Sequence, residues 1–232
     1  MSSVGLLYVG AVLCINGLML IGLVPGKAAA AMNLFVGGMQ VVFPTLIILG
    51  ADGDAATILG ASGLYLFGFT YLYVAWNVLT DAPGEGLGWF SLFVAACAVV
   101  YGILQFTMFD DPLFGIIWFS WAVLWLQFFV LLALGNAGIE KWTGWFALFL
   151  GVATGAIPAF LLLTGSYTTG PTEAIVASIA ALVLLILAWV LGKAGSQRAA
   201  NAPAARPDPG QHPDPAQHPD PALNPDPAPR PV

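Results

Sequence analysis

Long apolar stretches alternate with short polar ones along the first 191 residues of the chain. Each apolar stretch is about 20 residues long, the length that an α-helix needs to cross the roughly 30 Å hydrocarbon core of a bilayer. Their interiors contain no Asp, Glu, Lys, Arg or His, and Glu173 stands at the edge of the last one. The pattern predicts seven membrane-spanning helices, at residues 3–24, 28–50, 57–79, 87–109, 113–134, 142–164 and 173–191.

The composition and the loops favour an all-α integral membrane protein. Apolar residues make up 59% of the chain, charged residues make up 8%, and the mean hydropathy is +0.88, which excludes an ordinary soluble domain. Helices are expected because lipid offers no partner for backbone N–H and C=O groups, and because the stretches are too long and too uniformly apolar for barrel strands. The connections are short, so neighbouring helices are predicted to run antiparallel.

The six basic residues predict the topology, because Lys and Arg near helix ends stay on the cytoplasmic side of the membrane. With seven spans and the N-terminus outside, Lys27 and Lys141 fall in cytoplasmic loops. If residues 173–191 did not cross the membrane, the remaining basic residues would lie outside, so the charge bias favours a seventh span. Those residues are Lys193, Arg198, Arg206 and Arg230.

A Pro/Asp-rich segment begins at about residue 195. Eleven of the 17 prolines lie in residues 203–231, and a Pro-Asp-Pro motif recurs every six residues. With so few apolar residues, this segment is expected to be a disordered cytoplasmic tail. The predicted organisation is a six-helix core at residues 1–165, an additional transmembrane helix at 166–194 and the tail at 195–232.

The even-numbered stretches open with similar text, which indicates an internal repeat. The repeated text is NLFVGG at 33–38, SLFVAA at 91–96 and ALFLGV at 147–152. Since all three stretches run in one direction, the first six helices are predicted to form three parallel-repeated hairpins around one pathway, with the seventh helix outside. Chance similarity among apolar stretches is the alternative.

Aromatic and amide side chains are concentrated on the third and fifth stretches. Phe69, Tyr73 and Asn77 follow one another at four-residue spacing and therefore share a helix face. This face and a second aromatic face on the fifth stretch are predicted to meet each other or to line a lumen, with ordinary helix packing as the alternative. An interfacial aromatic belt does not explain the tryptophans in the middle of the fifth stretch. The face on the fifth stretch consists of Trp118, Trp121, Leu124 and Trp125.

Uncharged polar residues also lie within the apolar stretches. Their usual role is to bond a neighbouring helix, which is worth about 0.6 to 2 kcal/mol each, and the alternative is to face a solute. A path lined by rings and amides, with no ionisable group at membrane depth, favours a small uncharged polar molecule such as a planar amide or urea. The polar residues include Asn16, Asn33, Gln40, Thr70 and Gln127.

The chain offers no constellation for catalysis. No Ser-His-Asp, Cys-His, paired-carboxylate or metal-ligand arrangement lies at a suitable position, so no enzymatic activity, metal or cofactor is expected, and no nucleic-acid partner. A retinal protein needs a membrane-embedded lysine, and Lys27, Lys141 and Lys193 all lie at span ends. The strongest alternative to a solute path is a membrane scaffold whose proline-rich tail recruits a cytoplasmic partner.

In its apolar stretches the chain resembles the AmiS/UreI family of bacterial urea channels and short-chain amide transporters. The matching blocks occur in the family's order and cover residues 1 to about 165. They are LLYVG at 6–10 followed by Asn16-Gly17, MNLFVGG at 32–38, LFGFTYLYVAWN at 66–77, WFSLFVA at 89–95, IIWFSWAVLWL at 116–126 and IPAFLL at 157–162.

The resemblance implies a homo-hexamer in the bacterial plasma membrane, in which each six-helix protomer holds its own pore for a small neutral amide or urea. A cytoplasmic amidase or urease is the implied protein partner. Asn16 and Trp118 match residues near the pore, and Asn77 shares the face of its neighbours on the third helix. The positions that match the family's pore constriction are Val9, Leu13, Phe69, Tyr73, Trp121, Leu124 and Trp125.

Departures from the family pattern bear on gating. The acid-gated members carry a long first outside loop with histidines, whereas residues 51–56 of this chain form a short loop without His. A carboxylate in the sixth helix of the acid-gated member is replaced by Leu150, and the two histidines of the chain, His212 and His218, lie in the predicted tail. These features favour the amidase-associated branch of the family and a path that acid does not open.

Overall fold

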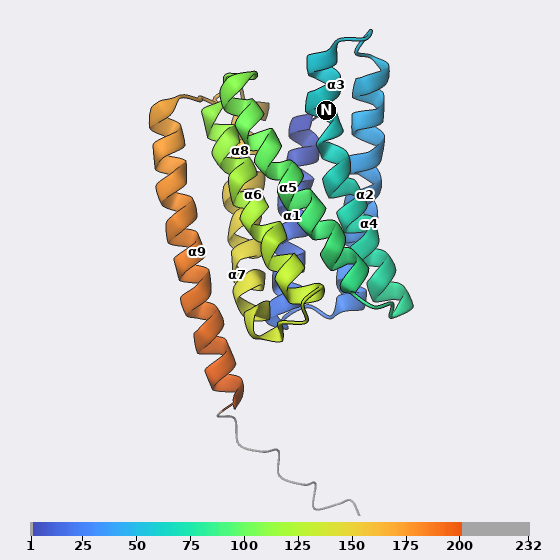
Figure 1. Cartoon of the computed structure of the whole chain (residues 1–232), viewed down its shortest axis with the longest axis vertical. Coiled ribbons are helices and arrows are strands. Elements are labelled where there is room, and N and C mark those ends of the chain that lie inside the picture. The colour runs from blue at the N-terminus through green and yellow to red at the C-terminus, as the bar shows by residue number, and fades with distance from the viewer. Residues whose placement is uncertain (1, 201–232) are drawn as a thin grey trace, which may run out of the picture. The chain divides into compact units, whose positions relative to one another are not determined.

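The computed structural model describes residues 2–200 of the 232-residue chain, which form a bundle of long helices without a β-strand in that range (Figure 1). The longest elements are α1 (Ser2–Ile21), α2 (Gly26–Leu49), α5 (Glu85–Thr107), α6 (Pro112–Leu132) and α9 (Pro171–Ala200). The remaining elements are α3 (Ala55–Ser62), α4 (Leu64–Thr80), a short 3-10 helix at Ala137–Ile139, α7 (Glu140–Leu150), the π-helical segment η2 (Gly151–Ala156) and α8 (Ile157–Leu163).

The prediction of seven membrane-length spans is confirmed within residues 2–200. Two of the spans are composite. The third joins α3 and α4 through Gly63, whose backbone angles remain near-helical. The sixth runs through α7, η2 and α8 without a break in the helical residues. All seven spans lie close to the bounds that the hydrophobic pattern predicts.

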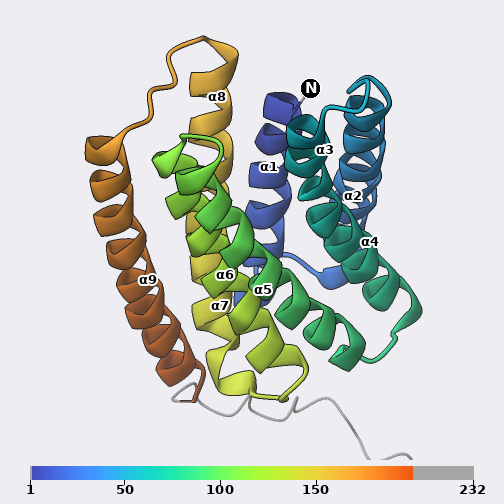
Figure 2. The same ribbon diagram turned by 45° about the horizontal axis from the view of Figure 1, so that its top comes forward.

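Six spans surround a common centre, and α9 lies outside them. Packing is most extensive between α2 and α4, between α5 and α6, and between α1 and α7, so each close pair joins helices from two of the predicted hairpins. Figure 2 shows α9 at one edge of the bundle and α2 with α4 at the other. Equivalent positions in the repeated motif all point inward, since Val36, Val94 and Leu150 are almost completely buried. The prediction of an all-helical bundle with seven membrane-length spans is confirmed, and the grouping into three hairpins stays a prediction.

Glycines allow α1 to approach the sixth span closely. A Cβ added at Gly10 would lie 2.6 Å from the carbonyl oxygen of Gly151, and one added at Gly17 would lie 2.6 Å from the carbonyl oxygen of Gly144. The two glycines on each helix are about two helical turns apart, so the backbones touch at two levels. Lipid provides no hydrophobic drive for helix association, and close approach through small residues supplies van der Waals contact in its place.

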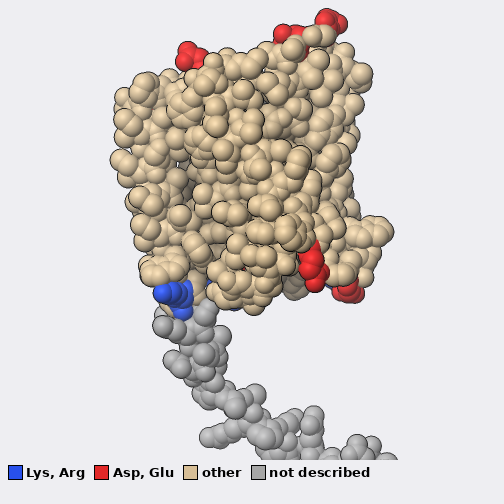
Figure 3. All heavy atoms as spheres, viewed as in Figure 1, with Lys and Arg blue, Asp and Glu red and all other residues tan. Residues whose placement is uncertain are grey.

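Charged residues lie at the two ends of the bundle, as Figure 3 shows for one face. Lys141 lies at the same end as Leu20, because its Nζ donates a hydrogen bond to the Leu20 carbonyl at 3.0 Å. Lys27 pairs with Asp81 at 3.5 Å on the exposed surface. We name this end, with Lys27, Lys141 and Lys193, the lysine end. The opposite end carries Asp52, Asp54, Asp110, Asp111 and Glu173, and we name it the acidic end.

The seventh span is attached to the bundle mainly through α7. The Trp142 indole N–H donates to the Leu185 carbonyl at 3.2 Å, and a Cβ added at Gly192 would lie 2.7 Å from the Trp142 backbone nitrogen. The helix continues to Ala200, so it runs past residue 195, where the tail was predicted to begin. The rest of the predicted tail, residues 201–232, lies outside the described residues.

Candidate transport path

Two cavities enter the bundle, one from each end. The acidic-end cavity has a volume of about 560 Å³, and the lysine-end cavity has a volume of about 230 Å³. Both are lined mainly by apolar and aromatic side chains with a few polar groups, the usual composition of a small-molecule site. Among the described residues that line the two cavities, Asp111 is the one that carries a charge.

A layer of tightly packed side chains separates the two cavities. On each of three helices, two side chains one turn apart line opposite cavities. Leu124 lies between the pair on α6, is completely buried and lines neither cavity. We name these seven residues the constriction: Val9 and Leu13 on α1, Phe67 and Tyr71 on α4, and Trp121, Leu124 and Trp125 on α6.

Phe67 is the centre of the aromatic contacts in this layer. Its ring centroid lies 4.8 Å from that of Trp121 and 5.1 Å from that of Trp125, both in edge-to-face geometry, and 5.6 Å from that of Trp118. Such aromatic pairs contribute about 0.5 to 1.5 kcal/mol beyond the area that they bury. Phe67 therefore links α4 to α6 across the centre of the bundle.

Two threonines hold the tryptophans of the constriction. The Trp121 indole N–H donates to Thr154 Oγ1 at 2.9 Å, and the Trp125 indole N–H donates to Thr70 Oγ1 at 3.2 Å. Each threonine hydroxyl donates in turn to the carbonyl four residues earlier. Thr154 lies in η2, and π-helical segments of this kind are frequent at functional sites. Because both indole N–H groups are bonded within the protein, the rings offer apolar faces and edges to the path.

Amide side chains lie beside the lysine-end cavity. Asn16 and Asn33 form a reciprocal pair, with Nδ2 to Oδ1 distances of 2.9 and 2.7 Å, and Asn16 lines the cavity. Asn77 also lines it, and its Nδ2 donates to the Pro83 carbonyl at 3.3 Å. Within the described part of the chain, Asn77 Oδ1 and the Tyr71 hydroxyl have no hydrogen-bond partner. The cavity wall therefore contains polar groups that are not fully used by the protein itself.

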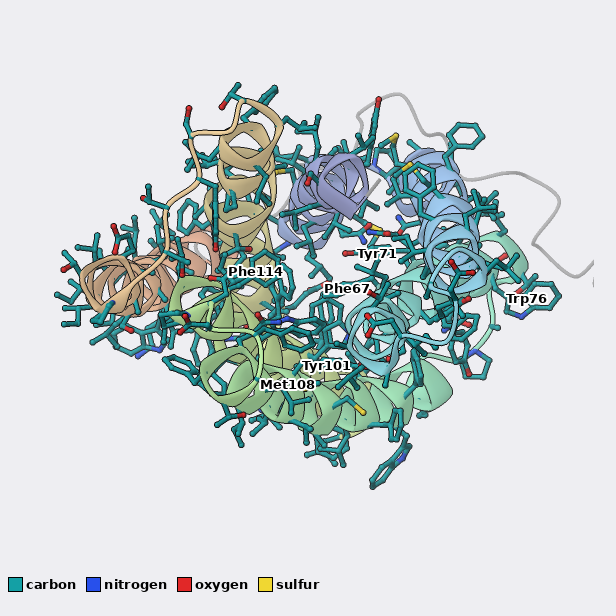
Figure 4. All side chains as sticks on the ribbon, turned by 90° about the horizontal axis from the view of Figure 1, so that it is seen from above. Phe67, Tyr71, Trp76, Tyr101, Met108 and Phe114 are labelled. Atoms are coloured by element: carbon teal, nitrogen blue, oxygen red, sulfur yellow. The ribbon has the colours of Figure 1, made fainter. Side chains whose placement is uncertain are left out.

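Phe69 does not take the predicted position in the path. Its side chain is 50% exposed on the outer side of α4, and its ring stacks on that of Tyr65 at 5.9 Å. Phe67 is two residues away, which is about 200° around the helix, and it is only 2% exposed. Figure 4 shows the same division, with Phe67 and Tyr71 pointing towards the centre and Trp76 pointing away from it. The prediction that Phe69 faces the tryptophans is therefore wrong.

Tyr73 also turns away from the constriction. Its hydroxyl lies at the start of α5, where a Cβ added at Gly86 would collide with it, and it lines neither cavity. Each step of four residues also rotates the side chain by about 40° around the helix. Of the three residues in the predicted face, only the last one, Asn77, therefore reaches a cavity. Phe67 and Tyr71 have the same spacing and lie on the inner side of α4.

Asp111 lines the acidic-end cavity and anchors the loop between α8 and α9 through hydrogen bonds. Its carboxylate accepts hydrogen bonds from the Phe114 N–H at 3.0 Å, the Tyr167 hydroxyl at 2.9 Å and the Thr169 hydroxyl at 2.6 Å. Burial and the neighbouring carboxylate raise the pKa of Tyr167 above its ordinary value, so its hydroxyl stays a donor. The one carboxylate at this cavity is thus held by the protein.

A helical membrane bundle with a cavity at each end and an uncharged constriction between them has the architecture of a membrane transport protein. The family match agrees with this class. The family model described as AmiS/UreI family transporter matches residues 1–166, which comprise the six-span core. The chain belongs to the AmiS/UreI family of transporters.

Relatives of known name cover most of the chain. It is 54% identical to the putative transporter protein AmiS2 of Rhodococcus erythropolis over 191 residues, which is 82% of this chain and 93% of that protein. It is 53% identical to the putative amidate substrates transporter protein of Mycolicibacterium smegmatis, over 83% of this chain and 91% of that protein. The acid-activated urea channel of Helicobacter pylori is 36% identical over 68% of this chain and 94% of that protein.

A solved structure shares the fold. The crystal structure of the urea channel from Helicobacter pylori matches with a TM-score of 0.66 at 36% sequence identity, covering 72% of this chain and 100% of that chain. The family match ends at residue 166, before α9 begins. The seventh span therefore lies beyond the residues that the family model matches.

Proposed function

We propose that the protein is a passive channel for small neutral amides and urea. The observation that carries the proposal is the uncharged constriction that lies between a cavity at each end of the bundle. The relatives named as an amidate substrates transporter and a urea channel support this class of solute. Transport is the activity, and the solute leaves the path chemically unchanged.

The constriction selects by shape. The rings of Phe67, Trp121 and Trp125 replace water around the flat faces of an amide, while the Tyr71 hydroxyl and Asn77 Oδ1 are available to exchange hydrogen bonds with its polar edge. An ion in this layer would lose its hydration without gaining a counter-charge, which costs far more than the same transfer of an uncharged polar group. A planar neutral solute is therefore favoured over both ions and bulky molecules.

The proposed orientation places the lysine end in the cytoplasm and the N-terminus outside. Lys27, Lys141 and Lys193 all lie at that end, which supports the orientation because basic residues near span ends stay cytoplasmic. The proposed location is the bacterial plasma membrane, with six copies in a ring. A cytoplasmic amidase or urease that consumes the entering solute is the proposed partner.

Solute flux into proteoliposomes tests the proposed function. The purified full-length protein is expected to accelerate equilibration of acetamide and urea over protein-free vesicles without any ion gradient, since the charged residues of the spans lie near their ends and none lies at membrane depth to couple transport to an ion. Stopped-flow light scattering after a solute jump measures the rate. If the protein does not change the rate for either solute, the channel proposal is contradicted and the scaffold alternative is favoured.

Flux is expected to stay constant between about pH 5 and pH 8. Hydrogen bonds from the Thr57 hydroxyl and backbone N–H lower the pKa of Asp54 further below this range, and burial raises the pKa of Tyr167 further above it. Asp54 is therefore charged and Tyr167 neutral throughout. Urea and acetamide rates in vesicles buffered equally on both sides check the prediction, and a steep rise on acidification would contradict it.

A further inference from the structure

Gln40 is a buried amide in the wall of the acidic-end cavity. It lies on α2, which contributes no side chain to the constriction, and it is 0% exposed. Its Nε2 donates to the Gly5 carbonyl on α1 at 3.3 Å, whereas its Oε1 has no hydrogen-bond partner among residues 2–200. Buried polar atoms are nearly always bonded, so an unpartnered oxygen in a cavity wall points to a ligand that completes it.

The orientation of the Gln40 amide follows from its neighbour. The Gly5 carbonyl only accepts hydrogen bonds, so the amide nitrogen must face it, and a flipped amide would bring two oxygens together. A Cβ added at Gly5 would lie 3.0 Å from Oε1, so the glycine leaves room for this arrangement. The oxygen is therefore an acceptor that needs an N–H or O–H donor.

The lysine-end cavity contains a matching group. Asn77 donates through Nδ2 to the Pro83 carbonyl, which again only accepts, and its Oδ1 is unpartnered within the described part of the chain. Each cavity thus has one amide that is anchored through its nitrogen and leaves its carbonyl oxygen unused. The two amides lie on opposite sides of the constriction.

We propose that Gln40 Oε1 binds an N–H group of the solute before it enters the constriction, with Asn77 Oδ1 as the corresponding acceptor on the other side. The ligand class is a primary amide or urea, which presents N–H donors at its edge. This inference rests on the proposed channel function and deepens it, because shape alone does not distinguish a primary amide from an N-alkylated amide of the same size.

Three isomeric solutes test the inference, because they share one composition and differ in their N–H donors. Propionamide has two N–H bonds, N-methylacetamide has one and N,N-dimethylformamide has none. After subtraction of protein-free vesicles, wild-type flux is expected to fall in that order. In Gln40→Met, which keeps the length of the side chain without the acceptor, the propionamide rate relative to that of N,N-dimethylformamide should fall about two- to tenfold, the factor expected for one hydrogen bond.

Gln127→Met is the matched control. Gln127 is also a buried amide with unpartnered atoms, but it lines neither cavity, so its replacement should leave the order and the ratio unchanged. A Gln40→Met variant with the wild-type ratio, or an equal loss in Gln127→Met, would overturn the inference. Size-exclusion profiles check that both variants are folded.

The wild-type comparison needs no variant. Equal rates for the three isomers in the wild type would overturn the acceptor site while leaving the channel proposal intact. Absence of flux for all three solutes, and for acetamide and urea, would overturn both. The two failures are therefore distinguishable even if Gln40→Met does not fold.

Discussion

Replacing Phe67 with alanine is expected to widen the constriction and to raise butyramide flux relative to acetamide flux at least about tenfold. Phe67 fills the space between the tryptophan rings, with its centroid 4.8 Å from Trp121 and 5.1 Å from Trp125. Accepting or rejecting a methylene group in a tight apolar site is worth about 1 to 3 kcal/mol, or roughly 10- to 200-fold in selectivity. Light scattering of vesicles after jumps of the two solutes measures the ratio.

Phe69→Ala is the control on the same helix. Its ring lies on the outer side of α4, so the ratio of butyramide to acetamide flux should not change. Removing a buried aromatic ring costs about 3 to 5 kcal/mol, and Phe67→Leu therefore provides a milder variant if the alanine form is unstable. An equal change of the ratio in both alanine variants would show that Phe67 does not line the path.

Gly10→Val is expected to prevent stable folding of the bundle. A Cβ at this position would lie 2.6 Å from the Gly151 carbonyl oxygen and 2.7 Å from the Ala156 backbone nitrogen, and backbone atoms cannot rotate away. Overpacking of this kind typically costs about 1 to 3 kcal/mol, and more where a backbone must move. The expected result is aggregated protein, or a melting temperature well below that of the wild type, in detergent.

Gly38→Val provides the comparison for this substitution. Gly38 lies within α2, and a Cβ added there would meet no atom within 4 Å. This variant should therefore yield protein with nearly the wild-type melting temperature and flux. If Gly10→Val were as stable as Gly38→Val, the close contact between α1 and the sixth span would not be a determinant of the fold.

The spans could be predicted because charge and length report directly on the bilayer. A side chain such as Asp52 or Asp81 cannot enter the hydrocarbon without a large cost, so the charges mark the ends of the helices. The close pairing of α1 with the sixth span could not be predicted in the same way. Gly10 and Gly151 are far apart in sequence, and nothing in the periodicity of either helix indicates which partner each glycine contacts.

The α6 residues of the candidate site could be predicted from their spacing and the α1 residues only through the family resemblance, whereas the inner face of α4 could not be predicted. The text of the third helix contains two aromatic pairs with identical spacing, Phe67 with Tyr71 and Phe69 with Tyr73, and spacing alone does not distinguish them. The burial of Phe67 and Tyr71, which decides between the two pairs, is seen only in the structure.

Thr154 could not be predicted as the partner of Trp121. In a regular α-helix each side chain points in a direction fixed by its number, but η2 adds a residue to the turn and changes that direction. The bond between Thr154 and Trp121 therefore depends on backbone geometry that hydrophobic periodicity does not encode. The unpartnered oxygen of Gln40 is equally invisible in sequence, because its orientation depends on the Gly5 carbonyl of another helix.

In the proposed channel, the uncharged constriction with its bonded indole N–H groups would also oppose any ionic current. A membrane potential of about 100 mV supplies only ~2.3 kcal/mol per elementary charge, whereas an unpaired ion in a dry apolar layer is opposed by a cost that reaches tens of kcal/mol. The potential therefore cannot drive ions through this layer. A cell could therefore hold many copies of the proposed channel and still retain the voltage and proton gradient that power its ATP synthesis.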